Sequence, residues 1–240
     1  MTEFVIRIAD CNVGVRAVFE ETKTYCTEYL TDGEPAFTVE TTMEDICRER
    51  QLSDRERELE GLPSVNHSDQ VLETTAVYRK IVEKLIDYDV LLFHGSVVAV
   101  DGVAYMFTAV SGTGKSTHTK LWRKLFGARA VMINDDKPLF KITQTGILVC
   151  GTPWDGKHHL NTNCMVPLKA ICVLKRGQEN EIQPLSARQA LPVLLQQSYR
   201  PGNMLKYMDL IDAVTKDVKF YELHCNMDPA AAQVAYDGMQ

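Results

Sequence analysis

The hydrophobic pattern changes several times along the chain, and each change predicts a different element. Apolar and polar residues alternate over residues 4–8 and 36–39, which is the period of a half-buried strand. Residues 69–87 instead carry apolar side chains at helical spacing. Charged residues dominate 44–60, and this pattern predicts a solvated helix or loop or, alternatively, a lid whose arginines contact phosphate. We therefore expect a small α+β region over residues 1–89.

A hairpin is predicted where this region ends. Residues 91–100 and 103–110 are two apolar runs rich in β-branched side chains, and Asp101-Gly102 joins them. An Asp-Gly pair accepts the positive φ angles of a type I′ turn, which joins two antiparallel strands. The second strand of this pair should therefore have an antiparallel neighbour directly before it in the sequence.

Strands and helices should alternate through the rest of the chain. Strand patterns occur at residues 128–134, 140–142, 147–149, 168–174 and 218–223. Helix starts are predicted at Ser186, where Gln189 completes a capping box, at Asn203 and at Asp228-Pro229. Residues 90–240 are thus expected to form one α/β domain.

Composition narrows the classes of function. The 240 residues carry 26 basic and 32 acidic side chains, so the net charge of −6 gives no general attraction for nucleic acid. No apolar stretch reaches the ~18 residues of a membrane-spanning helix. Residues 1–10 lack the layout of a signal peptide. We expect a cytoplasmic protein without nucleic-acid or membrane partners; the sequence leaves the oligomeric state open, including a homo-oligomer.

The seven cysteines indicate buried reduced thiols rather than disulfides. Their number is odd, they are widely spaced and no C-x-x-C pair occurs. His158 and His159 lie near Cys164 and Cys172, but adjacent histidines fit no usual zinc-ligand spacing. We therefore expect no structural zinc.

A glycine-rich segment directly after the predicted hairpin has the composition of a phosphate-binding loop. Its residues are Ser111, Gly112, Thr113, Gly114, Lys115, Ser116 and Thr117. In a P-loop, glycines let backbone N–H groups turn toward phosphate oxygens, while the helix N-terminus, the lysine and a serine-bound magnesium supply positive charge. We expect these residues to bind ATP, or another nucleoside triphosphate, with Mg²⁺. The alternative is a glycine-rich turn without a ligand.

Two details set this loop apart from ordinary P-loops. Ala109 stands where the first glycine of the usual pattern is expected, so the entry to the loop should differ. Ordinary P-loop proteins also place the preceding strand in a parallel sheet of right-handed βαβ units. A hairpin in that place predicts another α/β architecture, a mixed sheet whose P-loop follows an antiparallel hairpin.

Two acids follow the next predicted strand. Asp135 and Asp136 come directly after residues 128–134, so strand, loop, helix and strand make a βαβ unit. Such a unit brings the carboxyl end of its second strand beside the phosphate loop. One carboxylate could hold magnesium and the other could orient or deprotonate an attacking hydroxyl. The alternative is that both acids end the strand in a solvated turn.

A second loop, residues 150–161, combines several kinds of recognition chemistry. Its candidate substrate contacts are Trp154, Asp155, Lys157 and His158. Asp155 could complete the magnesium shell or accept a substrate hydroxyl, and Lys157 could neutralise phosphate charge. Alternatively, Trp154 anchors the loop to the core and the charges are solvated.

Few cations remain to stabilise a transferring phosphoryl group. Lys175, Arg176 and Arg200 follow the loops described so far. Arg200 precedes Pro201 in a predicted turn between two helices, which makes it the candidate. The alternative is an ordinary surface arginine.

Together these segments resemble the HPr serine kinase/phosphatase and phosphoenolpyruvate carboxykinase group of P-loop proteins. The resemblance rests on Phe93-His94-Gly95, the Asp-Gly hairpin, the S-G-T-G-K-S-T loop and Asn134-Asp135-Asp136, and it covers roughly residues 90–175. It implies that Lys115 contacts the β- and γ-phosphates and that Ser116 binds magnesium, with Asp136 near the metal. It further implies that Asp135 is the catalytic base and that His94 lies close to the reacting centre.

The sequence therefore predicts an HPr-kinase-like enzyme that uses ATP and Mg²⁺ to phosphorylate a hydroxyl group. The glycine-rich signature that the HPr kinase carries after its core has no counterpart here, so we expect a different acceptor. The first choice is a small molecule, such as an amino acid, sugar or polyol, and the second is a protein serine. The alternatives are a nucleotide-binding sensor or assembly factor that transfers no phosphoryl group, and a carboxykinase-like activity.

Overall fold

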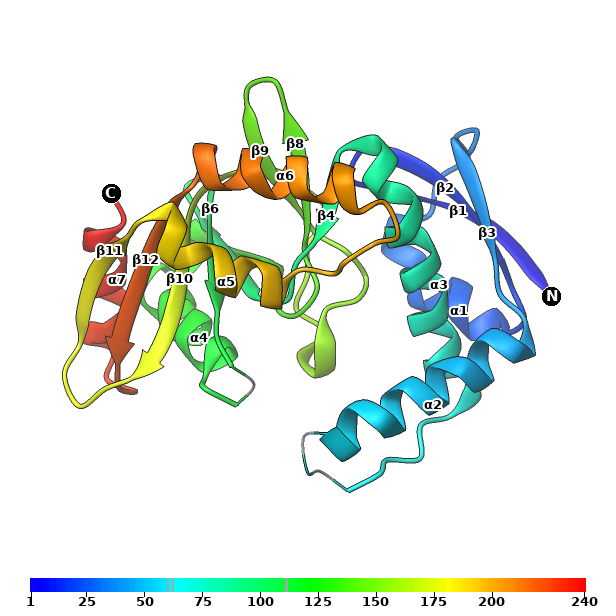
Figure 1. Ribbon diagram of the computed structural model, residues 1–240, viewed down its shortest axis with the longest axis horizontal. Coiled ribbons are helices and arrows are strands. Elements are labelled where there is room, and N and C mark those ends of the chain that lie inside the picture. Colours follow the sequence, from blue (N-terminus) through cyan, green and yellow to red (C-terminus); the bar gives the residue numbers. More distant parts are fainter. Residues whose placement is uncertain (60, 62, 111) are drawn as a thin grey trace. The chain divides into compact units, whose positions relative to one another are not determined.

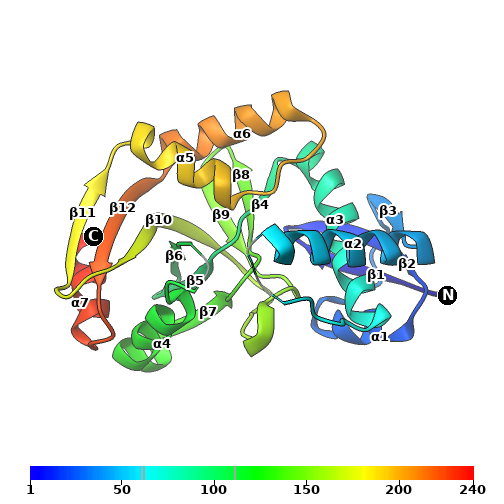
Figure 2. The ribbon, with the colours of Figure 1, turned by 60° about the horizontal axis from the view of Figure 1, so that its bottom comes forward.

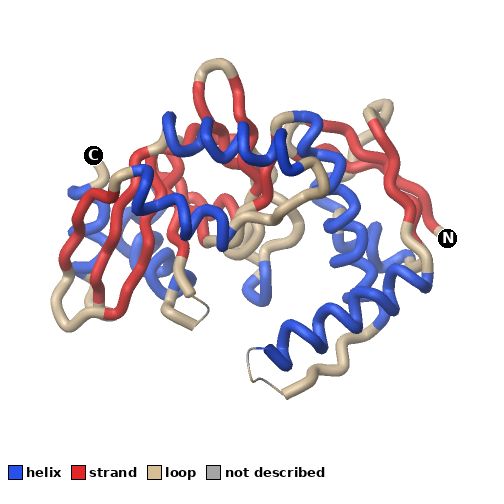
Figure 3. Tube along the Cα trace, viewed as in Figure 1, coloured by secondary structure: helices blue, strands red, loops and turns tan. Residues whose placement is uncertain are grey.

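The computed structural model describes residues 1–240 except 60, 62 and 111. It is a mixed α/β protein that divides into two compact units, Met1–Leu85 and Ile86–Gln240, each with its own sheet (Figures 1 and 3). The sequence analysis had placed this division at residue 89. No helix in the described part of the chain is long and apolar enough to cross a membrane.

The N-terminal unit contains a small sheet and the helices that pack on it. Its elements are β1 (Thr2–Ile8), β2 (Cys11–Ala17), α1 (Glu20–Tyr25), the 3-10 turn η1 (Thr27–Tyr29), β3 (Phe37–Glu40), α2 (Met43–Leu59) and α3 (Asp69–Leu85). β2 lies between β1, to which it is antiparallel, and β3, to which it is parallel. The alternation over residues 4–8 and 36–39 predicted β1 and β3 correctly.

The sequence analysis missed β2 and α1. The turn between β1 and β2 is made by Ala9 and Asp10, whose φ angles are 48° and 59°. Neither residue is the glycine that normally announces such a conformation, so no turn signal separated the two strands. The charged segment 44–60 is indeed largely helical, and Arg50 of α2 pairs with Asp69 of α3 at 2.6 Å.

A buried carboxylate joins several segments of this unit. Glu73 of α3 is fully buried, and its Oε1 accepts hydrogen bonds from the Val18 N–H at 2.6 Å and the Thr41 hydroxyl at 2.7 Å. Its Oε2 accepts from the Phe19 N–H at 2.9 Å and the Thr22 hydroxyl at 2.7 Å. Four donors thus compensate the loss of water around one charge.

The C-terminal unit is built on a mixed sheet that has nine strands within the described residues. Its elements are η2 (Ile86–Tyr88), β4 (Val90–Leu92), β5 (Ser96–Val100), β6 (Val103–Thr108), α4 (Lys115–Phe126), η3 (Gly127–Arg129), β7 (Ala130–Asn134), β8 (Leu139–Thr143), β9 (Gly146–Cys150), η4 (Gly156–His158), β10 (Met165–Arg176), β11 (Glu181–Leu185), α5 (Ala187–Gln197), α6 (Met204–Asp217), β12 (Lys219–Cys225) and α7 (Ala230–Gly238). Most of these elements match the predicted segments; β11 was missed.

The strand order confirms the hairpin and the βαβ unit. β5 is antiparallel to β6 and to β7, so β6 and β7 run parallel with β5 between them, and α4 connects them. Asp101 and Gly102 have φ angles of 53° and 81°, as a type I′ turn requires. β10 continues the sheet as the parallel neighbour of both β6 and β12. The carboxyl ends of β6 and β7 therefore meet at one edge.

Each face of this sheet packs against its own pair of helices. Val97 and Ala99 of β5 belong to the core on the side of α5 and α6, whereas Val98 and Val100 belong to the core on the side of α4 and α7 (Figures 1 and 2). Successive residues of a strand point to opposite faces, so a strand covered on both faces is apolar throughout. This explains the continuous apolar run that the sequence shows here.

The single strand predicted over residues 91–100 is wrong, because the structure divides it into β4 and β5. Backbone N–H groups of the residues between them bond to other segments, from His94 to the Gln197 carbonyl at 2.7 Å and from Gly95 to the Asp136 carbonyl at 3.0 Å. Gly95 also lies so close to β6 that a Cβ there would be 3.0 Å from the Phe107 carbonyl oxygen. Because the backbone changes its hydrogen-bond partners at this point, β4 ends and β5 begins, and His94 lies at the edge where β6 and β7 end.

Replacing Glu73 with glutamine should destabilise the N-terminal unit selectively. The new amide group would face two of the four donors and leave them unpaired, at a cost of about 2–4 kcal/mol. Hydrogen exchange of peptides from residues 1–85 should accelerate, while peptides from 86–240 keep their rates. Glu44→Gln, at a side chain that is 87% exposed, is the matched control. Equal exchange rates in the two variants would contradict this account.

Candidate functional site

The glycine-rich loop connects β6 to α4 and depends on its glycines. Gly112 and Gly114 have φ angles of 74° and 119°, in the left-handed region that favours glycine. Thr113 closes the turn, because its N–H and its hydroxyl donate to the Val110 carbonyl at 3.2 and 2.7 Å. Ser111, which the sequence analysis included among the nucleotide-binding residues, lies outside the described residues. The loop is thus a tight turn that leads directly into a helix.

The entry to this loop shows why alanine can replace the first glycine of the usual pattern. Ala109 is buried and does not adopt a positive φ, so its Cβ causes no backbone strain. Its carbonyl oxygen lies 3.5 Å from the Lys115 Nζ. The lysine side chain therefore folds back toward the strand that precedes the loop.

The first turn of α4 offers backbone donors. Gly114 is the N-cap and forms no side-chain cap, so no hydroxyl or carboxylate from that position occupies the first N–H groups. Such groups have no partner inside a helix and carry partial positive charge. Lys115 and Ser116 begin this turn. The arrangement suits an anion at the helix N-terminus.

Asp135 is held between the sheet and α4. It follows β7, is 6% exposed, and its Oδ1 accepts a hydrogen bond from the Ser96 hydroxyl of β5 at 2.6 Å. The Ser96 Oγ lies 3.0 Å from the Thr119 Oγ1, one turn along α4 from Lys115. This buried chain of hydrogen bonds fixes the carboxylate relative to the helix that begins at the glycine-rich loop. The sequence analysis missed Ser96 and Thr119.

Asp136 lies near His94 and two lysines. The His94 Nε2 lies 3.2 Å from the Asp136 Oδ1. Burial alone would raise the pKa of Asp136, but the hydrogen bond from His94 and the charges of Lys137 and Lys115 outweigh it and bring that pKa below its usual value. Burial lowers the pKa of Lys115, and the nearby charges of Asp136 and Asp135 partly offset this. In the structure, Lys115 thus lies close enough to both acids for their charges to interact, and His94 contacts Asp136.

Asn134, the last residue of β7, ties the two acids to the second loop. Its Oδ1 accepts from the backbone N–H groups of Asp136 at 2.9 Å and Lys137 at 2.7 Å. Its Nδ2 donates to the Thr152 carbonyl at 3.0 Å and lies 3.4 Å from the Trp154 carbonyl. Asn134 is fully buried, so these bonds are sheltered from water. One side chain therefore sets the position of the loop 150–161 beside the acids.

Asp155 in this loop is a buried carboxylate next to Asp136. It is 1% exposed, and its Oδ2 accepts from the Asn161 Nδ2 at 2.6 Å. Its Oδ1 has no hydrogen-bond partner among the described residues, although the His159 Nδ1 lies at 3.4 Å. Gly156 has a φ of 73°, and a Cβ on it would be 3.1 Å from the Asp136 Cβ. The loop therefore packs closely on Asp136.

The other residues predicted to contact substrate in this loop differ in how far they are exposed to solvent. Trp154 is 4% exposed, as expected for the alternative in which it anchors the loop to the core. Lys157 and His158 lie on η4 and are exposed. A ligand from solution can therefore reach the side chains of Lys157 and His158 but not the buried indole of Trp154.

The two arginines noted in the sequence bond to different parts of the unit, and the predicted role of Arg200 stays a prediction. Arg200 donates to the Leu195 carbonyl at 3.1 and 3.3 Å near the end of α5, and none of its described bonds reaches the glycine-rich loop. Arg176, noted in the sequence only as a remaining cation, donates to the Gly112 carbonyl at 2.8 Å. The pairing joins residues 64 positions apart, and no local pattern indicated it.

The oxygen ligands present here fit magnesium only in combination with a phosphate. No group of three His, Cys, Asp or Glu side chains in the described part of the chain could hold a metal ion by itself. Magnesium at nucleotide sites needs only one or two protein oxygens, since phosphates and waters supply the others. The Ser116 hydroxyl and the Asp136 carboxylate are of that kind. Magnesium itself stays a prediction.

Replacing His94 with phenylalanine should raise the pKa of Asp136, because it removes the largest of the influences that lower it. A depressed pKa means that the carboxylate stabilises the fold above the unfolded value of about 3.9. That stabilisation is lost as the pH falls through the folded-state pKa. Titration of the Asp136 carboxyl carbon by ¹³C NMR measures the change, with His67→Phe as the control. An Asp136 pKa unaffected by His94→Phe would contradict the pairing.

Comparison with known proteins identifies a family but not a reaction. No curated protein matches the chain. Among solved structures, the HPr(Ser) kinase/phosphatase from Coxiella burnetii matches over 61% of this chain and 95% of that chain, with a TM-score of 0.39 and 9% identity. A likeness this weak carries no conclusion about function. The family model that matches is a different one, described as SynChlorMet cassette protein ScmC, and it covers residues 60–228, more than half of the chain. The chain therefore belongs to the ScmC family of SynChlorMet cassette proteins.

Proposed function

We propose that this chain is a kinase that uses ATP and Mg²⁺ to phosphorylate the hydroxyl group of a small molecule. One observation carries the proposal: the glycine-rich turn, the uncapped N-terminus of α4 and Lys115 adjoin two acids. A buried hydrogen bond from Ser96 holds the Asp135 carboxylate, and a bond from the backbone N–H of Asp136 to Asn134 holds the second acid in place. The turn, the helix N-terminus and Lys115 attract a phosphate chain, and the carboxylates can manage a proton and a metal ion. A structural turn alone would need neither acid.

In the proposed phosphoryl transfer, each residue has a separate role. Backbone N–H groups of the loop and the Lys115 ammonium bind the phosphate oxygens and stabilise the charge that develops on them. A magnesium ion bound with Ser116 and Asp136 would neutralise further phosphate charge. Asp135 receives the proton of the acceptor hydroxyl while that oxygen bonds to the γ-phosphorus and ADP leaves. His94 lowers the pKa of Asp136 through its hydrogen bond to that carboxylate.

The second loop is the best candidate for acceptor binding. It packs on Asp136 through Gly156, and Asn134 holds it there. Asp155 supplies a buried carboxylate whose Oδ1 has no hydrogen-bond partner in the described residues, so an acceptor hydroxyl or ammonium could pair with it after a local opening of the loop. Because this carboxylate is buried, a small acceptor such as an amino acid, sugar or polyol is favoured. A protein serine is the second choice.

One observation favours a non-catalytic alternative. Asp135 is 6% exposed and already accepts a hydrogen bond from Ser96. A carboxylate in that position could serve to hold α4 in place, as in a nucleotide-gated sensor or assembly factor that binds ATP without transferring its phosphoryl group. The two functions make opposite demands on Asp135, and substitution of this residue distinguishes them.

Lys115→Ala should weaken binding of Mg²⁺·ATP by about ten- to a hundredfold, because it removes a charge-assisted hydrogen bond to phosphate. Isothermal titration calorimetry measures the dissociation constants. Lys120→Ala, at an exposed lysine of the same helix, is the matched control and should bind ATP as the unaltered protein does. Equal affinities for all three proteins would mean that the glycine-rich loop is not the nucleotide site.

Asp135→Asn should lower turnover by about a hundred- to ten-thousandfold while ATP affinity changes by less than about twofold. Transfer of label from γ-labelled ATP to pooled amino acids, sugars, polyols and cell-extract proteins identifies the acceptor class and measures turnover. Asp209→Asn, at an exposed acid on α6, controls for the loss of one charge. Full transfer by Asp135→Asn would rule out its role as base. Tight ATP binding without transfer to any pool would support the sensor instead.

A further inference from the structure

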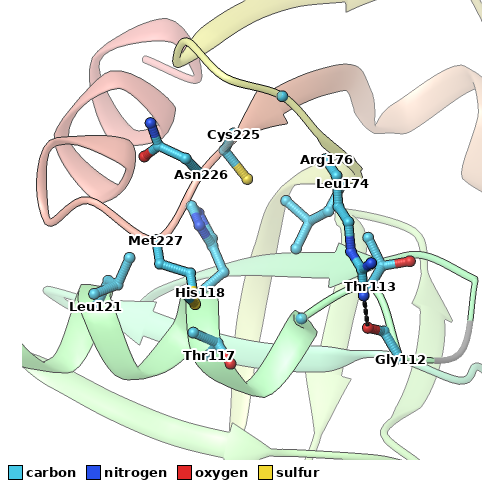
Figure 4. A pocket seen from close by; sticks show the side chains of 12 residues that line it. Gly112, Thr113, Thr117, His118, Leu121, Leu174, Arg176, Cys225, Asn226 and Met227 are labelled. Atoms are coloured by element: carbon cyan, nitrogen blue, oxygen red, sulfur yellow. Dashed lines mark hydrogen bonds between the residues drawn. The ribbon is translucent and has the colours of Figure 1, made fainter.

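A cavity adjoins the glycine-rich loop and is lined by the loop, α4, β10 and the chain at the end of β12 (Figure 4). Its volume is about 490 Å³, and Gly112 and Thr113 of the loop line it. α4 contributes His118 and Leu121, and Leu174 comes from β10. The chain that follows β12 closes the cavity. The volume lies within the range of small-molecule sites, and a ligand on the loop would have direct access to it.

His118 is the most unusual residue of this lining. It is 3% exposed, and its Nε2 lies 3.1 Å from the Nε1 of Trp122. An indole N–H can only donate, so the Nε2 of His118 must accept. Burial lowers the pKa of His118 to about 4, so the ring is neutral near pH 7. Its single proton is therefore on Nδ1.

This Nδ1–H has no hydrogen-bond partner in the described residues. Buried donors in folded proteins nearly always have one, because an unpaired donor loses its bond to water without replacement. The ring cannot rotate to find another partner, since the Trp122 bond and an edge-to-face contact with Phe107, 4.6 Å between centroids, hold it. The fold thus keeps an unused donor, itself buried, on a residue that lines a cavity.

The rest of the lining favours a ligand with acceptors over one with donors. Asn226 is already engaged, since its Nδ2 donates to the Gln178 carbonyl at 2.7 Å and its Oδ1 accepts from the Asp228 N–H at 2.9 Å. Burial raises the pKa of the Cys225 thiol, which leaves it a weak donor. No acidic side chain is among the described residues of the lining.

Adenine fits this combination better than guanine does. Every ring nitrogen that adenine exposes is an acceptor, whereas guanine carries a ring N–H that needs an acceptor such as a carboxylate. Leu121 and Leu174 supply apolar surface for the faces of a flat heterocycle. The glycine-rich loop at the edge of the cavity would hold the phosphates of the same nucleotide.

We propose that this cavity binds the adenine ring of the nucleotide and that, after a small shift of the lining, the Nδ1–H of His118 donates to one of its ring nitrogens. His118 is then the residue that holds the base, and the lack of an acidic side chain in the described lining disfavours guanine. The inference rests on the proposed nucleotide-binding function and adds to it the place where the base binds and the residue that contacts it.

The test replaces single atoms of the ligand. Titration calorimetry with Mg²⁺·ADP is compared with the 1-deaza, 3-deaza and 7-deaza analogues, each of which lacks one ring nitrogen. One analogue should bind the unaltered protein about three- to tenfold more weakly than ADP, the effect of one hydrogen bond. In His118→Phe, ADP should weaken by a similar factor and that analogue should no longer differ from ADP. His67→Phe, in the N-terminal unit, is the control. The analogue series on the unaltered protein stands even if His118→Phe fails to fold.

Two ligands separate failure of this inference from failure of the proposed function. GDP should bind more weakly than ADP, and Mg²⁺·tripolyphosphate should compete with both for the glycine-rich loop. If the three analogues and GDP all match ADP while tripolyphosphate competes, the base inference is overturned and the phosphate site stands. If neither ADP nor tripolyphosphate binds, both proposals are overturned.

Discussion

The hydrogen bond from the Ser96 hydroxyl to the Asp135 carboxylate is the interaction on which the site depends. A carboxylate that is 6% exposed needs compensating donors, and this bond, 2.6 Å long, supplies one from the first residue of β5. Ser96 can supply it because β5 lies between β6 and β7 and begins at the edge where both of them end. The Thr119 hydroxyl extends the chain of bonds to α4. The same few atoms thus relate the acid, the sheet and the helix that follows the glycine-rich loop.

The sequence predicted those parts of the fold that local chemistry determines. The Asp101-Gly102 turn, the glycines at positive φ after β6 and the capping box at Ser186 each require particular residues at particular places. The acids at the end of β7 followed from the βαβ pattern. Long-range partners could not be predicted in this way. Ser96 meets Asp135 across 39 residues and Asn134 meets Thr152 across 18, and serine or asparagine in a strand has many other uses.

The site that we propose combines a region that would attract negative charge with groups that would take part in proton transfer. Glycine-rich turn, helix N-terminus and Lys115 belong to the first, and Asp135, Asp136 and His94 to the second. Gly156 packs against Asp136, and this contact adds a loop that carries a buried carboxylate of its own, Asp155. The cavity beside α4 extends the site away from the acids, where a base rather than an acceptor would be recognised. Membership of the ScmC family is compatible with this division and does not itself indicate a reaction.

A crystal structure of the protein with a non-hydrolysable ATP analogue and Mg²⁺ tests the central claim most directly. The account predicts that the triphosphate lies in the turn formed by Gly112 and Gly114, and that the Lys115 Nζ leaves the Ala109 carbonyl, now 3.5 Å away, to contact phosphate. Asp135 should then face the γ-phosphate from the acceptor side. A nucleotide bound elsewhere, with Lys115 still directed at Ala109, would contradict the assignment of this loop as the phosphate site.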